Sequence, residues 1–349
     1  MKRNMRSVSV VALGFSLTAF FLLGGSARAA PAYYKGKTIR IMVPVSPGGT
    51  YDRMARLMAI HLPRHIPGKP TVIVQNRPGG GGLIGERFLY DSKPDGLIIG
   101  HFASGHCVKQ FTGIAEKIDF TKYEWLGSVA GSCYMLYIRS ELPYRSIDDL
   151  RNAPKPLKIG GIRKGSFVTD AALILKAMVG LNINVISGYG GYNPITLAIR
   201  QGELDGVATA VAVIGAHPLT KEMITTDFAR VVLLMRGMEP GEEYRELVKN
   251  LPDAGDFIKD SEDLTAYKAY MGLYAVARPF TAPPGTNPQA LEILRSSLWK
   301  TMNNEAFIAA AKKAGFTWGP TNHTVVAASI KSFLALPQAQ KQRLLNAWK

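Results

Sequence analysis

A glycine turn between an apolar strand and a helix offers the clearest chemistry in this chain. The stretch IRIMVPVSPGGTYDR, residues 39–53, runs from a strand pattern through the turn into an amphipathic helix pattern that begins at Tyr51. This order directs free backbone N–H groups and the positive end of a helix dipole at one point. Such a point binds a carboxylate or phosphate without a charged side chain, although an ordinary tight turn has the same pattern.

Three further segments carry related patterns. Residues 75–85, QNRPGGGGLIG, place a second glycine turn ahead of a helix pattern, and residues 92–100, SKPDGLIIG, place a Pro-Asp-Gly turn before an apolar strand. Residues 158–180 again run from strand through a glycine-containing loop to helix, with Ser166, Thr169 and Asp170 as candidate helix caps. The chain therefore has two sets of polar loops and helix starts, which indicates two lobes.

Strand and helix patterns alternate along the chain that must position these loops. Apolar, β-branched strand patterns lie at 38–45, 71–75, 97–102, 134–139, 157–160, 183–187, 206–211, 230–235 and 270–277. Helix patterns lie at 51–62, 82–91, 166–179, 193–201, 242–250, 288–302, 304–313, 322–334 and 337–348. This alternation predicts an α/β fold with mostly parallel sheets, in which ligands bind beyond the carboxyl ends of the strands.

The order PxxPGGxxD, NRPGGGG and KPDG-strand resembles one family closely. It is similar to the Bug-type, TctC-like extracytoplasmic solute receptors of tripartite tricarboxylate transporters. The resemblance continues through residues 159–169, 187–206 and 272–288, so it covers nearly the whole chain after residue 30. The order and spacing of these blocks are more specific than any one glycine loop.

The resemblance implies a two-lobed periplasmic binding protein fold, type II-like, with the ligand cleft between the lobes. Each lobe is expected to be a mostly parallel sheet flanked by helices. Residues 30–136 plus 274–349 would form lobe 1, and residues 137–273 would form an inserted lobe 2. Hinge strands are expected near 134–139 and 270–277, and the lobes are expected to close around a solute that contacts both.

The resemblance also implies the site. In lobe 1, the turn after the first strand would bind a ligand carboxylate through main-chain N–H groups and water, and the end of the strand at 97–102 would supply a second loop. In lobe 2, the loop after residue 160 and a Tyr-x-Gly turn would face the pocket. The residues expected to bind ligand are Ser46, Pro47, Gly48, Gly49, Thr50, Tyr51, Asp52, Phe102, Ala103, Ser104, Arg163, Lys164, Gly165, Ser166, Thr169, Tyr189, Gly190 and Thr209.

Two departures from the family pattern bear on the solute. A loop that is normally neutral carries Arg163 and Lys164, which either pair with a second carboxylate or point into solvent. Thr209 stands where many relatives have an Asp that can hold an amino group. Together these changes favour a di- or tricarboxylate, aliphatic or aromatic, over an amino acid. Aromatic residues near the loops, Phe167 among them, either form apolar walls or simply pack.

No catalytic constellation can be assembled from the sequence, and neither a cofactor nor a metal is expected. The chain lacks a GxSxG elbow, an HExxH pair and a CxxC pair. His101, His106 and Cys107 follow a strand where a pocket is expected, but they have no nearby acidic fourth ligand. Cys107 and Cys133 are either a disulfide, which an oxidising compartment permits, or two buried free thiols.

The N-terminal residues have the pattern of an export signal. A basic start, an apolar run from residue 8 to residue 23 and an Ala27-Arg28-Ala29 cleavage pattern predict a signal peptide over residues 1–29 and a periplasmic protein that is not a lipoprotein. A membrane anchor is the alternative, but no basic flank follows the apolar run. The net charge of +16 favours anionic solutes by steering. Lys and Arg are scattered without a recognition motif, which argues against nucleic-acid binding.

Together with the resemblance, these features predict a monomeric solute receptor. Its implied partners are the permease subunits of a tripartite tricarboxylate transporter. Two alternatives stay open. The loaded protein could instead signal to a periplasmic sensor domain, which requires the same closed form. A lyase or transferase on the same fold would require a titratable group with a partner in the cleft, and turnover of the solute.

Overall fold

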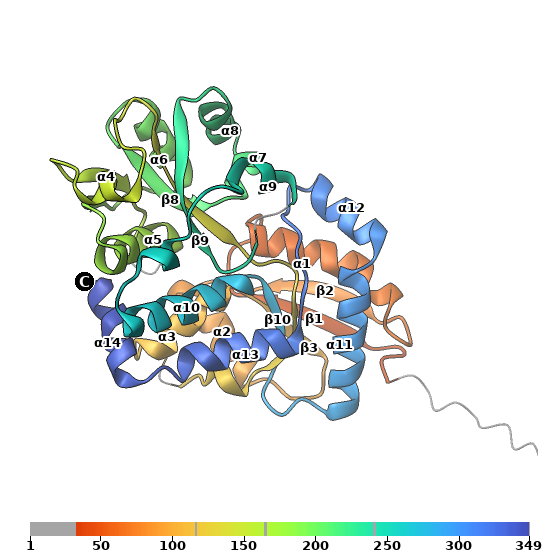
Figure 1. Ribbon diagram of the computed structural model, residues 1–349. Helices are drawn as coiled ribbons and strands as arrows, with labels where there is room; N and C mark the ends of the chain where they lie inside the picture. Colours follow the sequence, from red (N-terminus) through yellow and green to blue (C-terminus); the bar gives the residue numbers. More distant parts are fainter. Residues whose placement is uncertain (1–32, 116, 164–165, 240–241, 349) are drawn as a thin grey trace, which may run out of the picture.

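Two mixed β-sheets with helices packed against them make up the protein (Figure 1). The computed structural model describes residues 33–115, 117–163, 166–239 and 242–348. In Figure 1 the first sheet lies in the lower part of the molecule and the second in the upper part. The α/β architecture expected from the sequence is therefore confirmed.

The first sheet has the strand order β11-β4-β10-β3-β1-β2. Strands β1, β2 and β3 pair in parallel, whereas β10 is antiparallel to both β3 and β4, and β11 is antiparallel to β4. The strands are β1 (Thr38–Val43), β2 (Thr71–Asn76), β3 (Ile98–His101), β4 (Glu124–Ser128), β10 (Pro279–Ala282) and β11 (Thr321–Asn322).

The second sheet has the order β7-β6-β8-β5-β9. Strand β6 is parallel to β7 and β8, and β5 is antiparallel to β8 and β9. The strands are β5 (Cys133–Arg139), β6 (Leu157–Gly160), β7 (Ile183–Ile186), β8 (Gly206–Ala210) and β9 (Ala229–Arg236). The predicted parallel pairing is therefore confined to β1–β3 and to β6–β8. Strand β10 in the first sheet and β5 in the second run in the opposite direction, since each follows a passage of the chain between the sheets.

The helices cover the faces of both sheets. They are α1 (Thr50–His61), α2 (Leu83–Tyr90), α3 (Val108–Phe111), α4 (Ile147–Arg151), α5 (Phe167–Ile174), α6 (Tyr192–Arg200), α7 (Val213–Ala216), α8 (Pro218–Thr225), α9 (Glu242–Val248), α10 (Ser261–Ala275), α11 (Pro288–Met302), α12 (Glu305–Lys313), α13 (His323–Leu334) and α14 (Gln338–Ala347). Short 3₁₀ turns are η1 (Leu62–Arg64), η2 (Gly80–Gly82), η3 (Ser104–Cys107), η4 (Phe120–Lys122) and η6 (Ala254–Phe257), and one π-helical turn, η5 (Leu175–Val179), continues α5. None of the described helices is long and apolar enough to cross a membrane.

One predicted strand is wrong. Residues 270–277 lie mostly in helix α10, which begins where the Asp260 side chain accepts hydrogen bonds from the N–H groups of Glu262 and Asp263. Tyr267, Tyr270 and Tyr274 are buried at helical spacing, and α10 packs against α13 and α14. An apolar run that is buried on several sides has no clear period, so it reads equally well as a strand.

The chain passes between the two sheets twice, from β4 to β5 through residues 129–132, the first connection, and from β9 to β10 through a longer segment that ends with α10 and the second connection, residues 276–278. Residues 129–132 are hydrogen-bonded to the end of this longer segment. The Ser132 N–H donates to the Tyr274 carbonyl at 2.7 Å, and the Arg278 N–H donates to the Ala130 carbonyl at 3.2 Å. The predicted hinge at 134–139 lies within β5, inside the second sheet. We therefore propose residues 129–132 and 276–278 as the hinge, while the lobe boundaries stay a prediction.

Apolar packing continues beneath the junction of the two sheets. One core cluster joins Met42 of β1 with Leu136 of β5 and with the buried side of α10. Two further clusters lie on the first sheet with α1, α11 and α12, and on the second sheet with α6, α7, α8 and α9. The shared cluster therefore connects the two sheets, so that elements from both of them can contact one ligand.

Candidate functional site

A cavity of about 910 Å³ lies where the two sheets meet. Its walls come from the start of α1, the glycine turn η2, η3 with α3, the residues around the start of β5, the start of α5, the end of α10 and the helix α14. The lining includes Tyr51, Gly80, Gly81, Ala103, Ser104, His106, Lys109, Ser132, Tyr134, Arg163, Phe167, Asp170, Tyr274, Arg278, Gln342, Leu345 and Trp348. Elements of both sheets therefore contribute to one cavity, as a cleft between two lobes requires.

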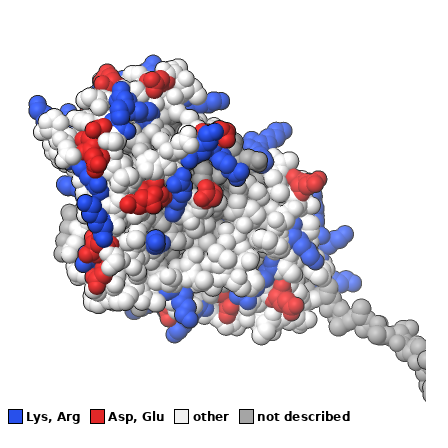
Figure 2. All heavy atoms as spheres, viewed as in Figure 1, with Lys and Arg blue, Asp and Glu red and all other residues white. Residues whose placement is uncertain are grey.

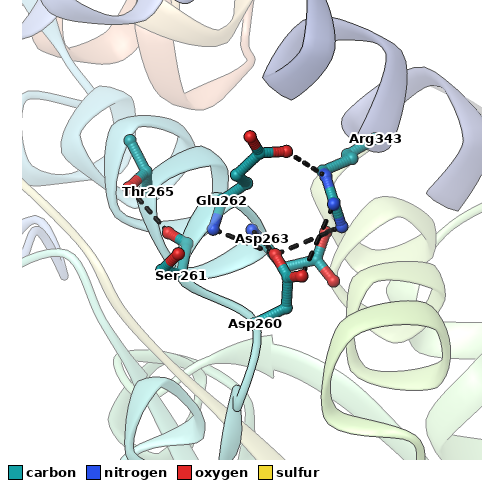
Figure 3. Close-up of polar contacts among 6 residues, drawn as sticks. All are labelled: Asp260, Ser261, Glu262, Asp263, Thr265 and Arg343. Atoms are coloured by element: carbon teal, nitrogen blue, oxygen red, sulfur yellow. Dashed lines mark hydrogen bonds and ion pairs between the residues drawn. The ribbon is translucent and has the colours of Figure 1, made fainter.

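Helix α14 is held against this cavity by an ionic cluster (Figure 3). The Arg343 guanidinium donates to the Glu262 carboxylate at 3.0 Å and to the Asp263 carboxylate at 2.9 Å, and it lies 3.2 Å from Asp260. Because these three acids form the first turn of α10, the cluster joins the end of the chain to the start of that helix. This attachment positions the side of α14 that lines the cavity.

One corner of the cavity contains a buried ionic cluster. The Lys109 ammonium donates to the two carboxylate oxygens of Glu86 at 2.9 and 3.1 Å and to the Gly81 carbonyl at 2.6 Å. The Nδ1 atom of His106 contacts the same carboxylate. Glu86 is fully buried, and burial alone would raise the pKa of its carboxyl, but His106 and Lys109 outweigh this effect and lower the pKa. Glu86 is therefore an anion that fixes both cavity-lining side chains.

Two arginines bring further positive charge to the cavity. Arg163 is exposed on the loop between β6 and α5, and burial together with the nearby charge of Arg163 lowers the pKa of Lys109 despite the opposing effect of Glu86. Arg278 lies in the second connection. Burial raises the pKa of the Tyr51 and Tyr134 phenols, and the charge of Arg278 partly offsets this effect. The cavity thus has cationic groups in two neighbourhoods, one of which combines Lys109 of the first sheet side with Arg163 of the second.

The wall between these cations is aromatic. Tyr134 of β5, Phe167 of α5 and Tyr274 of α10 all line the cavity. Tyr134 and Tyr274 meet edge to face, with ring centroids 5.3 Å apart. Burial raises the pKa of both phenols, so these side chains are neutral hydrogen-bonding and apolar surfaces.

Asp170 adds one acid to the lining. Its side chain is buried, and it accepts a hydrogen bond from the Tyr270 hydroxyl at 3.3 Å. The sequence offered Ser166, Thr169 and Asp170 as helix caps. Ser166 is the N-cap of α5 but its side chain makes no capping hydrogen bond, and Asp170 lies in the first turn. The cavity therefore has an acceptor as well as cations.

The first glycine loop is organised by Asp52. The Gly48 N–H donates to one Asp52 carboxylate oxygen at 2.8 Å, and the Asn76 amide donates to the other at 2.9 Å. Asp52 is almost fully buried; burial favours a higher pKa, but the hydrogen bonds from Arg56, Gly48 and Asn76 lower it. The Asp52 carboxylate consequently holds the loop in place. Because the Gly48 N–H donates to this carboxylate, it is not free to donate to a ligand.

The two glycines of this loop differ in backbone conformation, and this difference is testable. Gly48 has φ = +89°, whereas Gly49 has φ = −72° and space for a Cβ atom. Gly48→Ala should lower the free energy of unfolding by about 1–2 kcal/mol, because a side chain disfavours positive φ. Gly49→Ala should change it by less than about 0.5 kcal/mol. Urea unfolding curves of the two variants measure this, and equal losses would contradict the assigned conformations.

Four of the residues expected from the sequence line the cavity: Tyr51, Ala103, Ser104 and Arg163. Tyr51 donates its hydroxyl to the Ala277 carbonyl at 3.2 Å, and Ser104 donates to the Leu273 carbonyl at 2.5 Å. These two hydroxyls thus connect the cavity floor to the end of α10 and the connection that follows it.

The remaining expected residues lie elsewhere in the described structure or outside it, and their contact with ligand stays a prediction. Phe102 is buried against Phe120 and Trp125 in the first-sheet side of the core. Thr169 accepts a hydrogen bond from the Ile162 N–H at 2.9 Å. Residues outside the cavity lining are Ser46, Pro47, Gly48, Gly49, Thr50, Asp52, Phe102, Ser166, Thr169, Tyr189, Gly190 and Thr209. Lys164 and Gly165 lie outside the described residues.

The positions of His101, Cys107 and Cys133 give little support for catalysis or metal binding by these residues. His101 is buried, with Nδ1 2.9 Å from the Pro279 carbonyl, and burial lowers its pKa to about 3, so it is neutral. Cys107 and Cys133 are buried free thiols, which decides between the two alternatives left by the sequence. Within the described ranges, no group of three or more His, Cys, Asp or Glu side chains could hold a metal ion.

Comparison with known proteins identifies relatives that cover most of the chain. Residues 54–218 match the family model described as tripartite tricarboxylate transporter family receptor. A UPF0065 protein of Bordetella pertussis is 23% identical over 316 residues, covering 87% of this chain and 89% of that protein. A TctC solute binding protein from Polaromonas has a TM-score of 0.71 at 19% identity, covering 90% of this chain and 99% of that one. An R. palustris protein with adipate has a TM-score of 0.58 at 18% identity, covering 90% and 97%.

Proposed function

Because this chain belongs to the tripartite tricarboxylate transporter receptor family, we propose that it captures a di- or tricarboxylate in the cavity between its two sheets. The observation that supports this most is the pair of cationic side chains, Lys109 and Arg163, which reach one cavity from opposite sides. A carboxylate placed beside them would accept a charge-assisted hydrogen bond from Arg163. It would also be attracted by the charge of Lys109, whose ammonium already donates to Glu86 and Gly81. A receptor binds its solute without converting it, in agreement with the absence of a catalytic motif in the sequence.

The source and destination of the solute form the second part of this proposal. The signal-peptide pattern of residues 1–29 supports export to the periplasm, and the family supports delivery to the permease subunits of a tripartite tricarboxylate transporter. Figure 2 supports the choice of a small anion over nucleic acid as the partner of this basic chain. On the face drawn there, Lys and Arg are interspersed with Asp and Glu and form no continuous basic stripe.

Adipate is a suitable first probe, because the R. palustris protein of similar fold contains it. In isothermal titration calorimetry we expect a saturable heat with adipate and none with the uncharged hexanediamide, which lacks the carboxylates. Equal affinity for both compounds would contradict recognition of charge. Absence of heat with every di- and tricarboxylate of a panel would contradict the proposed function.

Binding should also contract the molecule. Ligand contacts on both sides favour the closed arrangement only to the extent that they are stronger in it, and the two connections allow that motion. Small-angle X-ray scattering with saturating adipate should give a smaller radius of gyration than the empty protein, and mass spectrometry should recover intact adipate. An unchanged radius would argue for a rigid binder, and a converted product would favour the lyase or transferase alternative.

A further inference from the structure

We infer that the solute of this cavity is an aromatic carboxylate, whose ring lies against the wall formed by Tyr134, Phe167 and Tyr274. This inference rests on the proposed function and narrows it to one class of carboxylates. Its basis is the convergence of three rings from three different elements, β5, α5 and α10, on the cavity.

The position of this wall suits a ligand that contacts both sides of the cleft. Tyr134 comes from the strand that directly follows the first connection, and Tyr274 from the end of the helix that precedes the second. Phe167 is half-buried at the start of α5, four residues after Arg163. A carboxylate that reaches Arg163 would therefore place the rest of the solute beside these rings.

The wall is held in place from behind by Tyr270. Its ring is stacked on Phe167, with centroids 6.0 Å apart and planes 9° from parallel, and its hydroxyl lies 3.1 Å from that of Tyr274. The same hydroxyl donates to Asp170 at 3.3 Å. Because the rings are fixed before the solute arrives, ordering them costs little free energy on binding.

The lining of the cavity combines cations and the aromatic wall with further apolar side chains. These include Leu83, Val108 and Leu345. A saturated chain would gain only apolar burial from such a wall. An aromatic ring also gains from stacked or edge-to-face contact, which is worth roughly three- to tenfold in affinity for a ring pair.

The test compares ligands that differ only in ring saturation. The two pairs are benzoate with cyclohexanecarboxylate, and benzene-1,4-dicarboxylate with trans-cyclohexane-1,4-dicarboxylate. Calorimetric titration of the purified protein should give at least a threefold lower Kd for the aromatic member of a pair. A saturated member that binds as tightly as its aromatic partner, or binding of adipate with none of the four ring compounds, would overturn the inference and leave the proposed function standing.

Two variants test whether the preference for aromatic ligands comes from the wall formed by Tyr134, Phe167 and Tyr274. Phe167→Leu should reduce the aromatic preference to less than about twofold while leaving the affinity for the saturated partner nearly unchanged. The matched control is Trp299→Leu, since Trp299 is 40% exposed and lines a different cavity, near Pro288 and Leu291. A preference retained in Phe167→Leu would overturn the assignment to this wall. Absence of binding by adipate and by all four ring compounds would contradict the proposed function itself.

Discussion

Glu86→Gln should lower the free energy of unfolding at pH 7 by about 3–5 kcal/mol. The Glu86 carboxylate is fully buried, accepts two hydrogen bonds from Lys109 and contacts His106. A neutral amide would leave the Lys109 ammonium without its buried counter-charge, and the loss of one partner is more costly than the net value of the pair. Urea or thermal unfolding of the two proteins measures the difference.

The pH dependence of this difference has a definite sign. Burial raises the pKa of Glu86, but His106 and Lys109 bring it below its ordinary value of 4.5 in the folded protein. The stabilisation is therefore complete above the unfolded pKa and is lost as the pH falls through the folded one. The difference in the free energy of unfolding between wild type and Glu86→Gln should have its full value at pH 7 and shrink below about pH 4.

A matched control keeps this prediction specific. Glu124 forms a partly exposed ion pair with Arg295 at 3.1 Å, so Glu124→Gln should cost less than about 1 kcal/mol. If Glu86→Gln cost no more than Glu124→Gln, the buried cluster would not stabilise the fold, and the positions of Lys109 and His106 would have to be explained by other contacts.

The regular elements of this fold could be predicted from local pattern to a large extent. Strands such as β1 and β6, and helices such as α11, lie within two residues of their expected bounds, because alternation and helix caps are local properties. Strand β4 was missed, since the sequence EWLGS lacks β-branched residues. Helix α10 was mistaken for a strand near its end, because aromatic and apolar residues face several neighbours at once.

The candidate site was predictable where it depends on loops that follow strands. Arg163 and Ser104 follow β6 and β3, so the rule that ligands bind beyond strand ends found them. Lys109, Tyr274 and Arg278 were not found, because they enter the cavity through tertiary packing of α3, α10 and the second connection. No motif marks these residues in the sequence. Asp52, which was expected to meet the ligand, lies outside the cavity lining and accepts a hydrogen bond from Gly48, so its contact with a ligand stays a prediction.

Arg163→Ala should weaken the binding of adipate about 10- to 100-fold, or about 1.5–3 kcal/mol, with a much smaller effect on hexanoate. The reason is the distribution of cations in the cavity, with Arg163 beside Lys109 and Arg278 in a separate neighbourhood beside Tyr51. A dicarboxylate can use both neighbourhoods, whereas a monocarboxylate of the same length requires only one. Calorimetric titration of both compounds against wild type and variant measures the two losses.

Lys155→Ala is the control, because Lys155 is an exposed cation of the same sheet region that does not line the cavity. It removes one positive charge at a distance, so any general steering effect of net charge should appear equally in both variants. A loss with adipate confined to Arg163→Ala would therefore report a direct contact. Equal losses with adipate and hexanoate, or no loss with either, would mean that Arg163 faces solvent when the solute is bound. Recognition on the second-sheet side would then belong to neutral donors, such as the hydroxyl of Tyr134, which lines the cavity on β5.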